Sequence, residues 1–169
     1  MACTDRQAKL GERMAPELGA RPLGVRADFE LTAEQERVLQ ALEHYDWAPV
    51  VTRLVRDGVM PAAWVADAVV EFRRYLALRV LYPEQHLQMF SKHVDVVWHT
   101  CLLFSRQYAD YCQRAFGQFV HHEPSVEPLS AARIEEEWEA FQTCYERGFG
   151  PLPRLWQMAR PRQDNLYVD

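Results

Sequence analysis

The side chains best suited to chemistry are concentrated between residues 91 and 124, a stretch that contains four of the six histidines. Asp95 and His99 are four residues apart, so on a helix their side chains lie one above the other. A carboxylate and an imidazole in this arrangement can share a metal ion. Alternatively, Asp95 can orient the His99 ring through a ring N–H group.

A second pair of imidazoles, His121 and His122, follows a predicted helix end at Gly117. In an extended chain, neighbouring side chains point to opposite sides, so we expect at most one of the two to join His99. With Asp95, this predicts a site of two histidines and one carboxylate. Such a set suits iron, zinc or manganese and leaves positions open for water or a substrate.

Other interpretations of the same residues stay open. Asp95 and His99 can be hydrogen-bonded core groups beside the apolar Trp98, with no ligand at all. They can also act without a metal, with His99 as a general base and Asp95 orienting it. A nucleophilic pair of Cys112 with His121 is a weaker hypothesis, because most such cysteines are small core residues. The catalytic residues themselves remain unassigned.

Apolar periodicity and capping signals predict the helices that must position these residues. Predicted helices begin at the caps Thr32, Ser91, Ser105 and Ser130. A short helix runs from Val50 to Arg56, and a long one begins at Pro61 and is stopped by Pro83. On the long helix we expect Glu71, Arg73, Arg74 and Arg79 to face away from the apolar stripe. We expect Trp98 to be buried.

These elements predict an all-α fold, a single compact domain of five or six helices with no convincing strand. Residues 84–90 should be irregular, and Phe119–Glu123 should be short and extended. We expect an irregular N-terminal arm over residues 1–30, the helical domain over 31–156, and a C-terminal tail over 157–169. The last nineteen residues, rich in Pro and Arg, should wrap the surface.

Composition narrows the class of protein. The 169 residues are 49% hydrophobic with a net charge of −5, which is typical of one soluble globular domain. The acid excess argues against nucleic-acid binding. The longest apolar stretch, Val94 to Phe104, is too short to span a membrane, and the first residues lack the apolar core of a signal peptide. No Cys-x-x-Cys pair is present, which argues against a zinc finger. Because the sequence shows no export signal, we expect reduced thiols in the cytoplasm.

The motif order resembles that of a known family. Val94-Asp95-Val96-Val97-Trp98-His99, then Phe116-Gly117, His121-His122-Glu123-Pro124 and Phe149-Gly150 resemble the bacterial members of the glycine-rich-domain-containing-protein-like family. The resemblance covers roughly residues 60–156 by this motif order. It implies a domain of unknown function and names no reaction.

Two departures from the family pattern matter. Cys101 stands where some family members carry a second histidine after the Trp-His pair, which weakens the case for a His-x-His ligand pair here. Plant relatives carry a glycine-rich tail and have been linked to RNA biology. This chain has no such tail and an acidic net charge, so RNA binding is not carried over.

We therefore expect a small cytoplasmic metal-binding domain centred on Asp95, His99 and either His121 or His122. Whether such a domain is also a metal-dependent enzyme is left open by the sequence. Its partner would be a small molecule or another protein. The alternative is a non-catalytic interaction module in which the same motif is structural.

Overall fold

The structure is a computed structural model that describes residues 21–123 and 129–161. Over these residues the chain forms helices and no strand, which confirms the predicted all-α class. The helices are η1 (Pro22–Gly24, a 3-10 helix), α2 (Ala33–Glu43), α3 (Ala48–Asp57), α4 (Ala62–Leu81), α5 (Lys92–Leu103), α6 (Ser105–Phe116), α7 (Ala131–Phe149) and α8 (Arg154–Gln157). Most of the predicted arm and tail, residues 1–20 and 162–169, lies outside the described residues.

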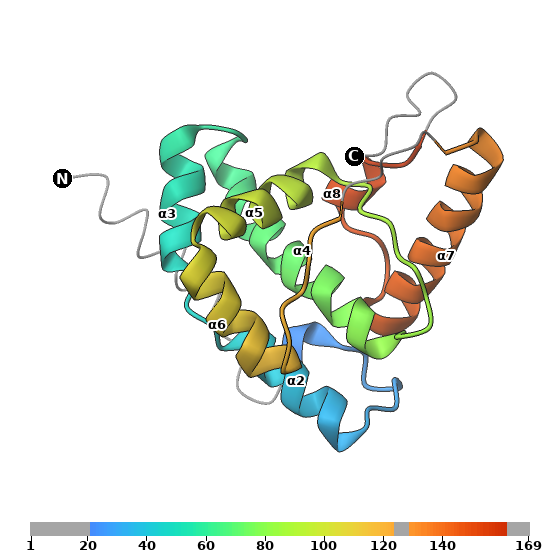
Figure 1. Ribbon diagram of the computed structural model, residues 1–169. Helices are drawn as coiled ribbons and strands as arrows, with labels where there is room; N and C mark the ends of the chain where they lie inside the picture. The colour runs from blue at the N-terminus through green and yellow to red at the C-terminus, as the bar shows by residue number, and fades with distance from the viewer. Residues whose placement is uncertain (1–20, 124–128, 162–169) are drawn as a thin grey trace.

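Helix α4 forms the centre of the molecule. Figure 1 shows it with α7 on one side and α5 and α6 on the other, and α4 contacts α2, α3, α5 and α7. Because neighbours surround it, α4 buries much more than a single stripe. Glu71 and Arg73, which we expected to face away from the core, are buried. That expectation was wrong because a helix packed on several sides has no fully solvated face for these residues.

The free-energy cost of burying the Glu71 carboxyl group is offset by three hydrogen-bond donors. Its Oε2 accepts hydrogen bonds from the Tyr145 hydroxyl at 2.6 Å and the Trp156 indole N–H at 2.7 Å, and Arg74 Nη1 donates to its Oε1 at 3.0 Å. Arg74 Nε also donates to the carbonyl of Leu23 at 2.9 Å. This Glu71 network therefore ties η1, α7 and α8 to α4. Burial, the largest influence, raises the pKa of the Glu71 carboxyl.

The helix ends agree only in part with the capping signals. Thr32 forms the predicted capping box on α2, and the Ser130 hydroxyl caps α7. Ser91 occupies the N-cap of α5, but its side chain makes no capping hydrogen bond. Ser105 is the first residue of α6 and does not cap it, and Pro61 is the N-cap of α4 instead of its first residue.

Two non-helical segments lie next to α5: one leads into it and the other approaches it after α6. Residues 82–91 connect α4 to α5, and the segment after α6 runs across α4 toward α5 in Figure 1. Both were predicted to lack helix. Near the C-terminus, Leu155 and Trp156 of α8 are buried. The expectation that the last nineteen residues only wrap the surface was therefore wrong for this turn.

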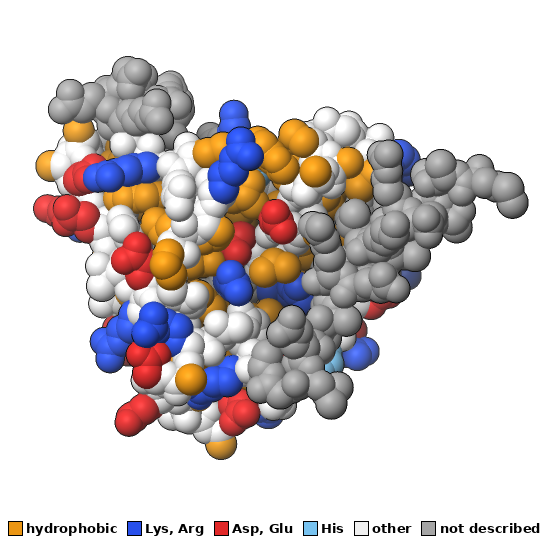
Figure 2. All heavy atoms as spheres, turned by 180° about the vertical axis from the view of Figure 1, so that it is seen from behind, with side chains coloured by type: hydrophobic (Ala, Val, Ile, Leu, Met, Phe, Trp, Pro, Cys, Tyr) orange, Lys and Arg blue, Asp and Glu red, His pale blue; other side chains and the backbone are white. Residues whose placement is uncertain are grey.

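The described surface is mixed in charge. Figure 2 shows Lys and Arg side chains interspersed with Asp and Glu on one face, with apolar side chains between them. Within the described residues, none of the helices combines the length and the apolar character needed to cross a membrane.

Candidate metal site

Helix α5 places Asp95 and His99 on the same face, one turn apart, as the sequence predicted. The two side chains meet at 3.5 Å between Asp95 Oδ2 and His99 Nδ1. Their surroundings differ sharply: the Asp95 side chain is 6% exposed and that of His99 is 55% exposed. The pair therefore spans the boundary between core and solvent, with the carboxylate inside and the imidazole at the surface.

His122 approaches the same carboxylate from the segment that follows α6. Its Nε2 lies 2.7 Å from Asp95 Oδ1, which is a hydrogen bond, and its side chain is 9% exposed. The His122 ring lies 4.3 Å from the Trp98 ring and 4.7 Å from the His99 ring, measured between centroids. Each carboxylate oxygen of Asp95 thus contacts a different imidazole: Oδ2 contacts His99 and Oδ1 contacts His122.

The sequence after α6 explains why His122, and not His121, turns inward. Helix α6 ends at Gly117, whose φ of 71° is left-handed and favours glycine. The following chain is extended, so side chains alternate between two sides. Val120 is buried, and His122, two residues later, shares its side. His121 is exposed and lies against the Phe119 ring at 4.8 Å.

A hydrogen-bonded chain fixes this segment against α5. The Trp98 indole N–H donates to the Tyr108 hydroxyl at 2.8 Å, and that hydroxyl donates to the Val120 carbonyl at 2.7 Å. The role of Tyr108 was missed, since its position on the apolar face of α6 favoured core packing over lining a pocket. A usable signal was present, because a buried Trp N–H normally finds a partner.

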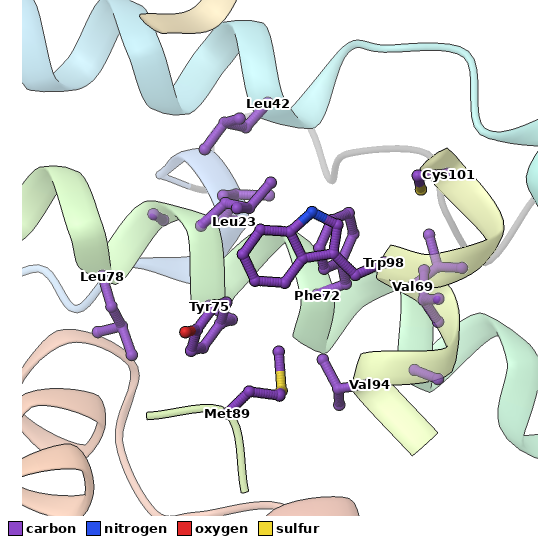
Figure 3. Close-up of a cluster of buried hydrophobic side chains, with 14 of the residues drawn as sticks. Leu23, Leu42, Val69, Phe72, Tyr75, Leu78, Met89, Val94, Trp98 and Cys101 are labelled. Carbon is purple, nitrogen blue, oxygen red and sulfur yellow. The ribbon is translucent and has the colours of Figure 1, made fainter. Parts of the chain in front are cut away.

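Trp98 itself is buried as expected, at 3% exposure. Figure 3 shows it projecting from α5 into a cluster with Phe72 and Tyr75 of α4 and with Met89 of the connecting segment. Its ring centroid lies 5.8 Å from each of the Phe72 and Tyr75 rings. The residue next to His99 in sequence therefore anchors α5 to the central helix.

The ligand atoms of Asp95, His99 and His122 all lie within 4.8 Å of one another. Protein ligands to zinc lie about 2.0–2.2 Å from the ion, which puts neighbouring ligand atoms of one site roughly 3–3.5 Å apart. Small side-chain rotations would therefore bring the three atoms around one ion. The structure thus brings together three of the four predicted residues, and His121 is not part of this group.

The hypothesis of a Cys112–His121 nucleophile is not supported by the geometry. Cys112 is buried, and the hydrogen-bond partners of its thiol are Tyr108 and the backbone of Val120. Burial raises the pKa of this thiol, which disfavours the reactive thiolate. His121 is exposed and contacts Phe119 instead.

Comparison with known proteins gives one match. A family model described as UCP032817-like matches residues 32–147, which is well over half of the chain and includes Asp95, His99 and His122. The matched region stops before α8. Neither the search of curated proteins nor that of solved structures found a match.

Proposed function

We propose that this chain, which belongs to the UCP032817-like family, binds one divalent metal ion through Asp95, His99 and His122. The observation that carries the proposal is the convergence of three potential ligand atoms within 4.8 Å, from a helix and from a separate extended segment. The family is uncharacterised, so the proposal rests on geometry and not on membership.

The donor set points to a transition metal. Two imidazoles and one carboxylate suit iron, zinc or manganese, and three protein ligands leave positions for water or a substrate. A metal held there would supply Lewis acidity and an activated water. The chain's own contribution is positional: Trp98 and the segment ending at His122 fix one imidazole, while the buried Asp95 offers both oxygens. We therefore propose a metal-dependent enzyme acting on a small molecule.

A structural role for the same residues has its own supporting observation. The 2.7 Å hydrogen bond between Asp95 and His122 already joins the extended segment to α5 without an ion. Together with the Trp98–Tyr108–Val120 chain, it can hold the fold in a non-catalytic interaction module. Acid–base catalysis by His99 is also compatible with its exposure beside the buried Asp95.

Calorimetric titration of the metal-stripped protein with Zn²⁺, Mn²⁺ and, without oxygen, Fe²⁺ separates these roles. We expect one ion per chain in the wild type and a loss of at least 10–100-fold in affinity in His99→Ala and His122→Ala. His121→Ala is the matched control, because His121 neighbours the site without entering it. Equal binding by His122→Ala and His121→Ala would overturn the proposal.

Two finer points belong to the same proposal. The motif resemblance to the glycine-rich-domain-containing-protein-like family agrees with an uncharacterised family, and we propose it as the wider relationship of this chain. We also place the protein in the cytoplasm. This proposed localisation is supported by Cys101, Cys112 and Cys144, which are free thiols, as expected in a reducing compartment.

A further inference from the structure

A cleft of about 500 Å³ opens beside His122. Most of the residues that line it are not candidate metal ligands. Its walls are the connecting segment around residues 83–89 and the segment 116–123, and α4 supplies Tyr75 and Arg79. Figure 1 shows both segments passing along α4. This volume is within the range typical of small-molecule sites.

The charged groups in this cleft favour an anion. Arg79 is the one Arg or Lys among its lining residues, and the imidazoles of His86, His121 and His122 also line it. Glu123 is the one carboxylate in the lining. Arg79 is exposed, and within residues 21–123 and 129–161 no ion pair joins it to a carboxylate. A guanidinium has five N–H donors, so beyond its hydrogen bond to Tyr75 the exposed Arg79 retains donors for a ligand.

Tyr75 lines the same cleft and is a hydrogen-bond partner of Arg79. The Tyr75 hydroxyl donates to the Leu87 carbonyl at 2.7 Å. Burial raises the pKa of Tyr75 to about 12, while Arg79, as a charge and a hydrogen-bond partner, lowers it and the Asp95 charge raises it. Of the three candidate metal ligands, His122 lines the cleft, so a small ligand held by Arg79 can extend toward His122.

We propose that this cleft binds a small molecule carrying an oxyanion group, a carboxylate or a phosphate, with that group on Arg79 and its other end toward His122. The planar guanidinium fork of arginine matches either oxyanion through two parallel hydrogen bonds. The placement of the ligand's other end toward His122 rests on the proposed function. The oxyanion site at Arg79 does not, since Arg79 and the cleft are present whether or not a metal binds.

The test uses succinate and inorganic phosphate as probes, titrated into the full-length protein and followed by the ¹⁵N chemical shift of Arg79 Nε. We expect saturable binding of at least one probe, and the tighter of the two identifies the oxyanion as carboxylate or phosphate. Arg79→Gln should weaken binding by about tenfold or more, with tryptophan fluorescence as the common readout for all variants. Arg79→Lys, which keeps the charge and loses the fork, should fall between.

Arg106→Gln is the control, because Arg106 is an exposed arginine outside the cleft. Saturation by neither probe, or equal affinities in Arg79→Gln and the wild type, would overturn the inference. Repeating the titration on metal-stripped and metal-loaded protein separates it from the proposed function. Arg79-dependent binding in a chain that takes up no metal supports the cleft and contradicts the metal site. Metal uptake by a chain in which Arg79→Gln binds both probes as well as the wild type does supports the metal site and contradicts the oxyanion cleft.

Discussion

Trp156 donates its indole N–H to Glu71 Oε2 at 2.7 Å, although the two residues are 85 positions apart in sequence. The contact holds α8 against the central helix through a carboxylate that is itself buried. Three donors, from Arg74, Tyr145 and Trp156, converge on this one side chain. A glutamine cannot serve all three, because its amide nitrogen cannot accept a hydrogen bond, whereas both oxygens of a carboxyl group can accept, whether it is charged or protonated.

Glu71→Gln should therefore lower the free energy of unfolding by about 1–3 kcal/mol. The difference should depend on pH. Burial raises the pKa of Glu71 above its ordinary 4.5, so the folded chain holds this proton more tightly than the unfolded chain. The contribution of Glu71 to stability is then full below pH 4.5 and is lost as pH rises through the raised pKa.

Urea unfolding of the wild type and Glu71→Gln across this pH range measures the difference. We expect the wild-type advantage to narrow from pH 4.5 toward neutrality. A widening advantage would mean that the hydrogen bonds outweigh burial and that the folded pKa lies below its ordinary value.

Trp98→Ala should lower the free energy of unfolding by about 3–5 kcal/mol, as the deletion of a large buried aromatic does. The reason is the loss of its packing on Phe72 and Tyr75 and of its hydrogen bond to Tyr108. Chemical denaturation followed by circular dichroism gives the value. Leu103→Ala, at a side chain of the same helix that is 67% exposed, is the control and should change stability by less than about 0.5 kcal/mol. A loss below 1 kcal/mol for Trp98→Ala would contradict this account of the core.

The helices and the i, i+4 pair of Asp95 and His99 were predictable because both follow from local periodicity. The extended chain around His121 and His122 predicted that at most one of these two histidines joins Asp95 and His99. Which one faces Asp95 was not predictable, because it depends on Val120 being buried and on the Tyr108 hydroxyl that holds its carbonyl. Such contacts join residues from different elements and leave no periodic signal.

The Glu71 network was missed for a related reason. On an isolated amphipathic helix, Glu71, Arg73 and Arg74 mark the solvated face. Their burial follows from the central place of α4 between helices on several sides, which is a tertiary property. The buried Trp156 likewise lies in a segment whose proline and arginine content indicated a surface tail.

Ser91→Ala should leave the free energy of unfolding unchanged or raise it by up to about 1 kcal/mol. Ser91 occupies the N-cap of α5, but its buried hydroxyl has no hydrogen-bond partner among residues 21–123 and 129–161. Thr32→Ala provides the contrast, because its hydroxyl accepts a hydrogen bond from the Gln35 backbone and its loss should cost about 1 kcal/mol. Thermal unfolding of both variants compares them directly. A Ser91→Ala loss as large as that of Thr32→Ala would show that the Ser91 hydroxyl has a stabilising partner.

In metal-free protein, His122→Ala should destabilise the fold more than His99→Ala. His122 is nearly buried and hydrogen-bonded to Asp95 at 2.7 Å, so its removal leaves that oxygen of the buried carboxylate without its partner, at a cost of about 1–3 kcal/mol. His99 is largely exposed and lies 3.5 Å away, so its removal should cost less than about 1 kcal/mol. Denaturant titration in the presence of a chelator makes the comparison. The reverse order would mean that His99 is the main partner of Asp95.

The most direct measurement for the central claim is the metal content of the protein purified without a metal-affinity tag, determined by elemental analysis. If Asp95, His99 and His122 form a metal site, the wild type should carry close to one ion of iron, zinc or manganese per chain. Asp95→Asn and His122→Ala should lose that ion while keeping their helical content, and His121→Ala should retain it. A wild-type chain with no stoichiometric metal, which also takes up none of the three metals when they are supplied, would contradict the claim and leave the three residues with a structural role.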